Sequence, residues 1–371
     1  MPKETSGPTL MKDRISPDVV THLADLLAAA SKSFKREEFL AAAIEGLESM
    51  EMKARVIHVA DALAAGLPAN FPKAAKVIDR ALKSPELNSW MAYAVDDYVA
   101  RYGIDFPEVA LPLMGKLTKR WSCEFAIRPF IREHPKETFE QFDIWIGSDD
   151  EDLRRLVSEG SRPRLPWGGF IPEFVEDPTP TIALLDRLVD DPSLYVRKSV
   201  ANHLNDIAKD HPELAIETAR RWLDGDPDSE RRHWIVGHGM RSLIKAGDPE
   251  ALALVGYDAG APVEIKGFEV NPDAIAIGEA VTISFTLVAE EETPVMVDYL
   301  VHHAGTKGAR SAKVFKLKKV KLSAGKPVLF RREHRIREVS VRKIYPGPHV
   351  IEVQVNGRVL AAATVEVTET G

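Results

Sequence analysis

At 371 residues, the chain is long enough for about two domains, because single hydrophobic cores seldom grow beyond about 250 residues. Its 44% hydrophobic and 28% charged residues are typical of a folded globular protein and argue against the disordered and membrane-spanning classes. The single cysteine, Cys123, excludes an internal disulfide and a multi-cysteine zinc site, and the formal charge of −7 taken alone argues against a nucleic-acid partner.

The N-terminal third is expected to be a series of helices. Residues 1–15 lack the apolar core of a secretory signal and are expected to form a flexible arm, so the chain is placed in the cytoplasm with no membrane partner. A helix is expected after Ser16, a good cap, and further helices at about 36–50, 52–66, 72–84 and 87–102. The aromatic residues Trp90, Tyr93 and Tyr98 are interpreted as core residues rather than ligand contacts.

An internal repeat runs from about residue 107 to 257. The strings REHPKETFEQFDIW and KDHPELAIETARRW align at their His-Pro pairs and both end on tryptophan, and AGDPEALALVGY is a weaker third copy. The spacing of the three prolines gives a unit of about 38 residues, which is typical of HEAT-like helix pairs. A curved solenoid over residues 16–259 is therefore expected, with its inner face as the binding surface.

The segment SEGSRPRLPWGGF, residues 158–170, interrupts the helical pattern. Pro163 and Pro166 would end a helix and would force the residues before them, Arg162 and Leu165, toward extended conformations. A rigid connection is expected, which would carry Glu159, Arg162, Arg164 and Trp167 at a defined angle to the preceding helix. The plainer alternative is a proline-rich loop in which the tryptophan fills a gap in the core.

Two helices of the repeat region carry polar stripes opposite apolar faces. The first stripe comprises Lys198, Asn202, Asn205, Asp206 and Lys209, and the second comprises Trp234, His238, Arg241 and Lys245. Both stripes suit a ligand that bears phosphates. The alternative is an ordinary solvated helix face.

From residue 260 to 371, the pattern changes to short runs rich in β-branched residues. Seven strands are expected: Val263–Val270, Val281–Val288, Val295–His302, Val314–Leu322, Val328–Arg337, His349–Val355 and Val359–Val367. An immunoglobulin-like β-sandwich without a disulfide is the expected architecture, and we expect it to pack on the end of the solenoid.

Charge is segregated between the two parts of the chain. From residue 261 onward there are 16 Lys and Arg against 13 Asp and Glu, whereas the preceding part holds 33 against 43. Residues 299–332 include ten basic and no acidic residues, and Lys316 and Lys318 lie in the densest part of this stretch. The stretch is a candidate phosphate-binding surface, and a solvated strand face is the alternative.

Three carboxylates interrupt this basic setting: Glu124, Glu159 and Asp206. The plain interpretation of each is a local ion pair, with Arg128, Arg162 and Lys209 respectively. Carboxylates that face a polyanion are unfavourable unless they stabilise a cationic group or a developing positive charge. They are therefore candidate catalytic residues.

No competing active-site pattern stands out. The sequence has no Walker-type or dinucleotide-binding glycine loop, and the pair His302-His303 is not followed by an acidic residue at metal-ligand spacing. We therefore expect no cofactor and no metal.

Three motifs of the helical region together resemble those of a known family. The helical repeats, with WSCEFAIRPFIREHP, SEGSRPRLPW and YVRKSVANHLNDIAKDHP, resemble the bacterial AlkC family of DNA alkylation repair glycosylases, which are relatives of the AlkD family. The resemblance covers about residues 15–257, and the appended immunoglobulin-like domain is similar to that of one AlkC subgroup.

This resemblance implies a monofunctional DNA glycosylase that removes cationic N3-alkylated bases, chiefly 3-methyladenine and 3-methylcytosine, from double-stranded DNA in base excision repair. The lesion would be reached by kinking the DNA on the concave face, without a deep base-flipping pocket. By the same resemblance, Glu124, Glu159 and Asp206 form the acidic cluster, and Trp167 is an aromatic wall at the base. The implied DNA-backbone contacts are Lys198, Arg162 and Arg164, beside the stripe and strand residues Asn202, Arg241, Lys245, Lys316 and Lys318.

A monomer is expected, associated with the nucleoid when it is bound to DNA. The alternative function is a non-catalytic HEAT-repeat scaffold whose groove holds DNA or a protein partner.

Overall fold

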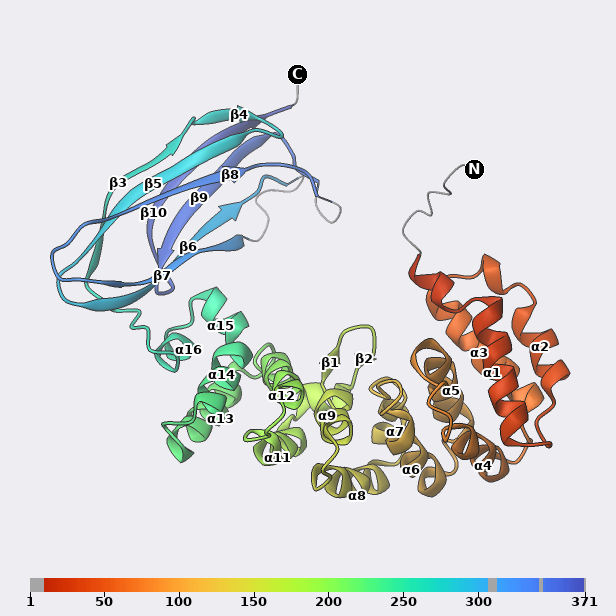
Figure 1. The fold of residues 1–371 in the computed structure, drawn as a ribbon. Helices are drawn as coiled ribbons and strands as arrows, with labels where there is room; N and C mark the ends of the chain where they lie inside the picture. The colour runs from red at the N-terminus through yellow and green to blue at the C-terminus, as the bar shows by residue number, and fades with distance from the viewer. Residues whose placement is uncertain (1–9, 306–311, 340–342, 370–371) are drawn as a thin grey trace. The chain divides into compact units, whose positions relative to one another are not determined.

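The computed structural model describes residues 10–305, 312–339 and 343–369 (Figure 1). Contacts divide the chain into two compact units, Met1–Asp210 and His211–Gly371. The division falls before the expected domain boundary at residue 259, because the last four helices group with the sheets. The order of elements, helices followed by two β-sheets, confirms the expected fold class.

The first unit is a series of helices interrupted by one small hairpin. Its elements are η1 (Met11–Arg14), α1 (Pro17–Ala30), α2 (Arg36–Ile44), η2 (Leu47–Ser49), α3 (Met52–Gly66), α4 (Phe71–Ala81), α5 (Ser89–Tyr102), α6 (Pro107–Leu117), α7 (Ile127–Glu133), α8 (Pro135–Ile146), α9 (Glu151–Gly160), β1 (Arg164–Leu165), β2 (Gly169–Phe170), α10 (Pro172–Glu176), α11 (Thr179–Leu188) and α12 (Leu194–Ile207). Each helix packs on helices close to it in the chain, as expected for a HEAT-like array.

The expected flexible arm, residues 1–15, includes an ordered turn. Residues 1–9 lie outside the described residues, whereas Met11–Arg14 form a turn of 3-10 helix. The buried Arg55 side chain donates hydrogen bonds to the carbonyl oxygens of Lys12 and Ile15, at 2.9 and 3.0 Å. These bonds fix the start of the helical array.

The repeat predicted from the His-Pro strings is confirmed by the helix starts. α8 and α13 (Pro212–Gly225) both begin at the proline, and the preceding histidines, His134 and His211, share a φ of −132°. Proline suits this position because the first helical N–H has no partner within the helix. The tryptophans that end the two strings are buried, and the weaker third copy forms α16 (Pro249–Ala253).

The second unit contains α13, α14 (Glu230–Gly239), α15 (Arg241–Ala246), α16 and, among its described residues, eight strands. The strands are β3 (Val263–Asn271), β4 (Ala274–Ala276), β5 (Ala280–Ala289), β6 (Thr293–His302), β7 (Lys313–Leu322), β8 (Val328–Arg335), β9 (Gly347–Val355) and β10 (Arg358–Thr368). They form one sheet in the order β4-β10-β9-β6-β7 and a second in the order β3-β5-β8. Side chains of both sheets share one core, as in an immunoglobulin-like sandwich.

Within the second unit, the last helices pack against the sandwich. The β9–β10 hairpin turns at Asn356 and Gly357, both with positive φ, and the Asn356 amide donates to the Asp258 carbonyl oxygen at 2.8 Å. A Cβ on Gly247, after α15, would lie 2.7 Å from the Gly357 carbonyl oxygen, so the two turns are in close contact.

No helix in the described ranges is long and apolar enough to cross a membrane.

Candidate functional site

The three candidate carboxylates lie in the first unit, where basic side chains link them into one chain of ion pairs. Arg155 of α9 contacts Glu124 and lies 3.6 Å from Glu159. Arg162 binds Glu159 at 2.7 Å and Asp206 at 2.8 Å, and Lys209 binds Asp206 at 2.9 Å. Acidic and basic groups therefore alternate from Glu124, before α7, to the end of α12.

Two of the carboxylates are buried and fully engaged. Glu159 is 6% exposed and Asp206 is 1% exposed. Arg162 and Lys209 each bind one oxygen of Asp206, while Arg162 and the Ser199 hydroxyl bind the two oxygens of Glu159. With both oxygens occupied, neither carboxylate is open to a ligand in this structure.

Glu124 differs from the other two carboxylates. Its side chain is 17% exposed, and Oε2 accepts hydrogen bonds from Arg155 and from the Ser122 hydroxyl, the latter at 2.8 Å. Its other oxygen, Oε1, has no hydrogen-bond partner in the described part of the chain. Glu124 is therefore a carboxylate held in place by one oxygen and accessible at the other.

The simple ion pairs expected from spacing are confirmed for two of the three carboxylates. Glu159 pairs with Arg162 and Asp206 with Lys209, but Glu124 pairs with Arg155 rather than with Arg128. The Arg128 side chain instead donates to the carbonyl oxygens of Gly160, Arg162, Gly168 and Gly169, at 2.8 to 3.2 Å. Burial lowers the pKa of Arg128 to about 10, which still leaves it charged at neutral pH.

The segment at residues 158–170 ends a helix before its prolines, as predicted, and continues as a β-hairpin, which was not predicted. The tight turn between β1 and β2 is closed by the Gly168 N–H, which donates to the Leu165 carbonyl oxygen at 3.1 Å. Pro166 and Trp167 are its central residues, and Trp167 has φ of 67° and is 83% exposed. The turn is thus of type II, in which the second central position favours glycine. Glu159, however, lies in α9 before the prolines and is buried, so the prolines do not direct it toward solvent.

A large cavity lies beside Glu124 and the hairpin. Its volume is about 700 Å³, and residues of α3, α5, the α6–α7 connection and the hairpin line it. Glu124, Trp167 and Gly168 contribute to its edge, together with Trp90 and Tyr93. The shallow site that the resemblance implies is thus accompanied here by an aromatic cavity.

The basic residues expected to contact DNA in the first unit have different surroundings. Lys198 is exposed on α12 and Asn202 is half-buried. Arg164 forms a bidentate pair with Asp210, with both distances at 2.6 Å, and its guanidinium stacks over the Phe170 ring. Arg162 is only 7% exposed and holds two carboxylates, so it positions the acidic cluster rather than offering a charge to a phosphate.

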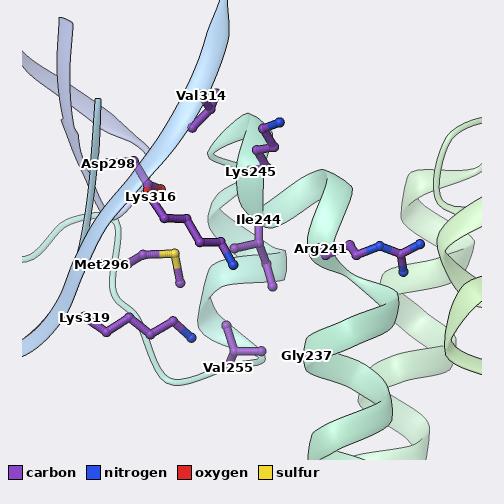
Figure 2. Close-up of a pocket in the computed structure, with 10 residues that line it drawn as sticks. All are labelled: Gly237, Arg241, Ile244, Lys245, Val255, Met296, Asp298, Val314, Lys316 and Lys319. Atoms are coloured by element: carbon purple, nitrogen blue, oxygen red, sulfur yellow. The ribbon is translucent and has the colours of Figure 1, made fainter. Parts of the chain in front are cut away.

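The second unit holds a smaller pocket of about 210 Å³ between α14–α15 and the strands β6 and β7 (Figure 2). Figure 2 shows Lys316 and Lys319 extending from β7 toward the helices, while Arg241 points away from the strands. Asp298 lies at the back of this pocket, where burial raises its pKa although Lys316 and Lys319 partly counter the effect. Lys245 also lines this pocket, and Lys318 is exposed on β7.

The polar stripes are less regular than their spacing indicates. Asn205 and Asp206 of the first stripe are buried, and the second stripe is divided because α14 ends before Met240 and α15 starts after it. Arg155 and Ser199 were missed because their role depends on partners in other helices. A helix with adjacent arginines after an acidic turn, GSDDEDLRR, is the only sequence signal for Arg155.

Comparisons with known proteins cover both units. A family model described as "Uncharacterised protein YhaZ, C-terminal Ig-like domain" matches residues 264–369. The protein YhaZ of Bacillus subtilis (strain 168) is 32% identical over 350 residues, which cover 94% of this chain and 97% of YhaZ. The solved structure of the Pseudomonas fluorescens alkylpurine DNA glycosylase AlkC, bound to DNA containing an abasic site analog, matches with a TM-score of 0.88 and 38% identity, covering 97% of this chain and 100% of that chain.

The hairpin geometry predicts an unusual order of stability at residue 167. Within a helix or strand, a variant with glycine is less stable than the same variant with alanine by about 0.5–1 kcal/mol. At the φ of 67° found here, Trp167→Gly should instead be more stable than Trp167→Ala by about 1 kcal/mol, because only alanine keeps the backbone strain. Urea unfolding of both variants tests this order, and a less stable glycine variant would contradict the turn assignment.

A buried histidine predicts acid sensitivity of the first unit. His203 Nδ1 lies 2.8 Å from the Ser158 carbonyl oxygen, and burial lowers the pKa of His203 to about 4. Because the unfolded chain binds this proton near pH 6.5, the contribution is present above that pH and is lost as the pH falls toward 4. Between pH 7 and pH 5, the wild type should therefore lose about 2 kcal/mol more unfolding free energy than His203→Asn. Equal losses in the wild type and in His203→Asn between pH 7 and pH 5 would contradict this assignment.

Proposed function

Since the chain belongs to the AlkC family of DNA alkylation repair glycosylases, in the subgroup with a C-terminal immunoglobulin-like domain, we propose that it is an alkylbase DNA glycosylase. Its substrates would be cationic N3-alkylated bases in double-stranded DNA, 3-methyladenine and 3-methylcytosine, removed without base flipping. The observation that carries the proposal is Glu124, a carboxylate fixed through Oε2 and open at Oε1 on the edge of a large cavity.

The reaction fits an accessible carboxylate. The bond from C1′ to the base nitrogen breaks, and its electron pair moves to the base, so the cationic base leaves as a neutral molecule. Positive charge develops on the deoxyribose, where Glu124 would stabilise it by electrostatic attraction. A water molecule then adds its oxygen to C1′, and Oε1 of Glu124 would orient this water and accept its proton.

We assign the other two carboxylates a positioning role. Glu159 and Asp206 hold Arg162 between them, and Glu159 also faces Arg155, the side chain that binds Glu124. Their effect on the reaction would thus pass through Arg155 to Glu124. Trp167, presented at the tip of the hairpin, would contact the alkylated base, where a cation–π contact contributes about 0.5–2 kcal/mol.

DNA binding would use the accessible cations of both units. In the first unit these are Lys198 and Arg164 with the neighbouring Asn202. In the second unit they are Lys245, Lys316, Lys318, Lys319 and the partly exposed Arg241. They would neutralise backbone phosphates, which position the duplex without reading its sequence. Arg162 is left out of this set because it is buried.

The role of Glu124 is tested by excision kinetics. Glu124→Gln should slow single-turnover release of 3-methyladenine from methylated double-stranded DNA by about 100-fold or more, because it removes the charge that stabilises the transition state. Thermal stability should change little, since the side chain is partly exposed and an amide can still bind Arg155. Asp206→Asn should instead lower the stability, because Arg162 and Lys209 lose a buried charged partner.

The matched control is Glu137→Gln, which removes an exposed carboxylate from α8. It should leave both excision and stability at the wild-type values. Wild-type excision by Glu124→Gln would refute the catalytic assignment.

The basic pocket of the second unit is tested by the salt dependence of DNA binding. If Lys316 and Lys319 each neutralise a phosphate, replacing both with glutamine should reduce the slope of log K against log salt by about 2. Fluorescence anisotropy with an undamaged duplex measures this slope. Lys266→Gln, on the other sheet and paired with Glu264 at 3.1 Å, is the control and should not alter the slope. An unchanged slope in the double variant would show that this pocket does not contact DNA.

A further inference from the structure

The cavity beside Glu124 has walls made of aromatic side chains. Trp121 lies at the centre of the group, with its ring 4.8 Å from that of Trp90 and 5.3 Å from that of Tyr93. Phe125 extends the same wall, 6.1 Å from Tyr93. All four rings are half-buried and line the cavity. Trp90 and Tyr93 are therefore not simple core residues, contrary to the sequence-based interpretation.

The borders of this cavity are held in strained backbone conformations. Non-glycine residues with positive φ number three in the described chain: Trp167 lines this cavity, and Ser89 directly precedes the lining residue Trp90. The Ser89 N–H donates to the Arg120 carbonyl oxygen at 3.2 Å, which ties α5 to the segment that carries Trp121. Such strain persists only where the surrounding structure fixes it.

A buried carboxyl group in the same cavity lacks partners. Asp96 of α5 is 1% exposed and lines the cavity, and neither of its oxygens has a hydrogen-bond partner in the described structure. Burial raises the pKa of Asp96 well above its usual value, and the nearby Cys123 thiol lowers this pKa by a smaller amount. Burial therefore favours the protonated form of this carboxyl, which carries one donor and one acceptor.

The other charges around the cavity are mostly paired. Arg101 binds Asp97 at 2.9 Å, and Glu124 binds Arg155, which leaves Lys53 as a further cation on the border. The interior is thus aromatic, with one carboxyl group that burial shifts toward its neutral form. Such a surface favours a flat, uncharged heteroaromatic ring that can stack and can pair through one edge.

We propose that this cavity is a binding site for a free nucleobase, and that it receives the base released when the glycosidic bond breaks. This inference rests on the proposed function, in which the cationic lesion becomes neutral as it leaves C1′ near Glu124. The aromatic rings of Trp90, Tyr93 and Trp121 stack on the released base, and the Asp96 carboxyl pairs with its edge. Both 3-methyladenine and unmodified adenine meet these requirements.

The test is calorimetric titration of the full-length protein, without DNA, with free 3-methyladenine and with adenine. Saturable binding is expected. Trp90→Leu should weaken it by about tenfold, in line with the loss of one stacking partner. Phe139→Leu, an equivalent change in a second apolar pocket of the same unit, is the control and should leave the affinity unchanged.

Variants of Asp96 provide a second test of the same binding site. Asp96→Leu should weaken base binding while leaving the melting temperature unchanged or raised, because the native carboxyl is buried without partners. Asp96→Asn keeps a donor and an acceptor and should bind like the wild type.

The outcomes separate the inference from the proposed function. A protein that excises 3-methyladenine but gives no saturable binding of the free base overturns the inference alone. Binding of the free base without excision of any lesion supports the cavity as a base site and overturns the proposed function. Equal affinities for the wild type, Trp90→Leu and Asp96→Leu would show that the base binds elsewhere and would also overturn the inference.

Discussion

The site depends on one buried guanidinium, that of Arg162, held between Glu159 and Asp206. A buried charge is tolerated only when its partners are in place, so this contact fixes α9 and α12 relative to each other. Arg155 lies on the same helix as Glu159 and reaches the carboxylate of Glu124. The position of the Glu124 carboxylate is therefore set by a chain of ion pairs that begins at Asp206 on α12.

A second arginine, Arg128, fixes the hairpin as Arg162 fixes the two helices. Arg128 contacts four carbonyl oxygens around the ends of the 158–170 segment, which makes the base of the hairpin rigid although its tip is exposed. Trp167 can thus be presented to solvent in a strained conformation without being lost to disorder. Rigid support of this kind keeps a side chain in the fixed position that specific ligand binding requires.

Local sequence signals predicted the framework well, because each depends on residues close in the chain. The His-Pro helix starts, the end of α9 before the prolines and the Asn356-Gly357 turn belong to this group. The bridging role of Arg162 could not be predicted, since Asp206 is 44 residues away and only folding brings the two together. The same holds for Trp90 and Tyr93, because helical periodicity shows which side chains face inward but not whether neighbouring residues fill the space. The short strand β4 was missed, since three residues give no usable alternation.

The central claim is that Glu159 acts through Glu124, and a double-mutant cycle tests it most directly. Single-turnover excision of 3-methyladenine would be measured for Glu124→Gln, Glu159→Gln and the double variant. If Glu159 only positions Glu124, adding Glu159→Gln to Glu124→Gln should cause almost no further loss of rate. Losses that multiply, with the double variant slower by the product of the two single effects, would contradict the account and would give Glu159 a direct part in the reaction.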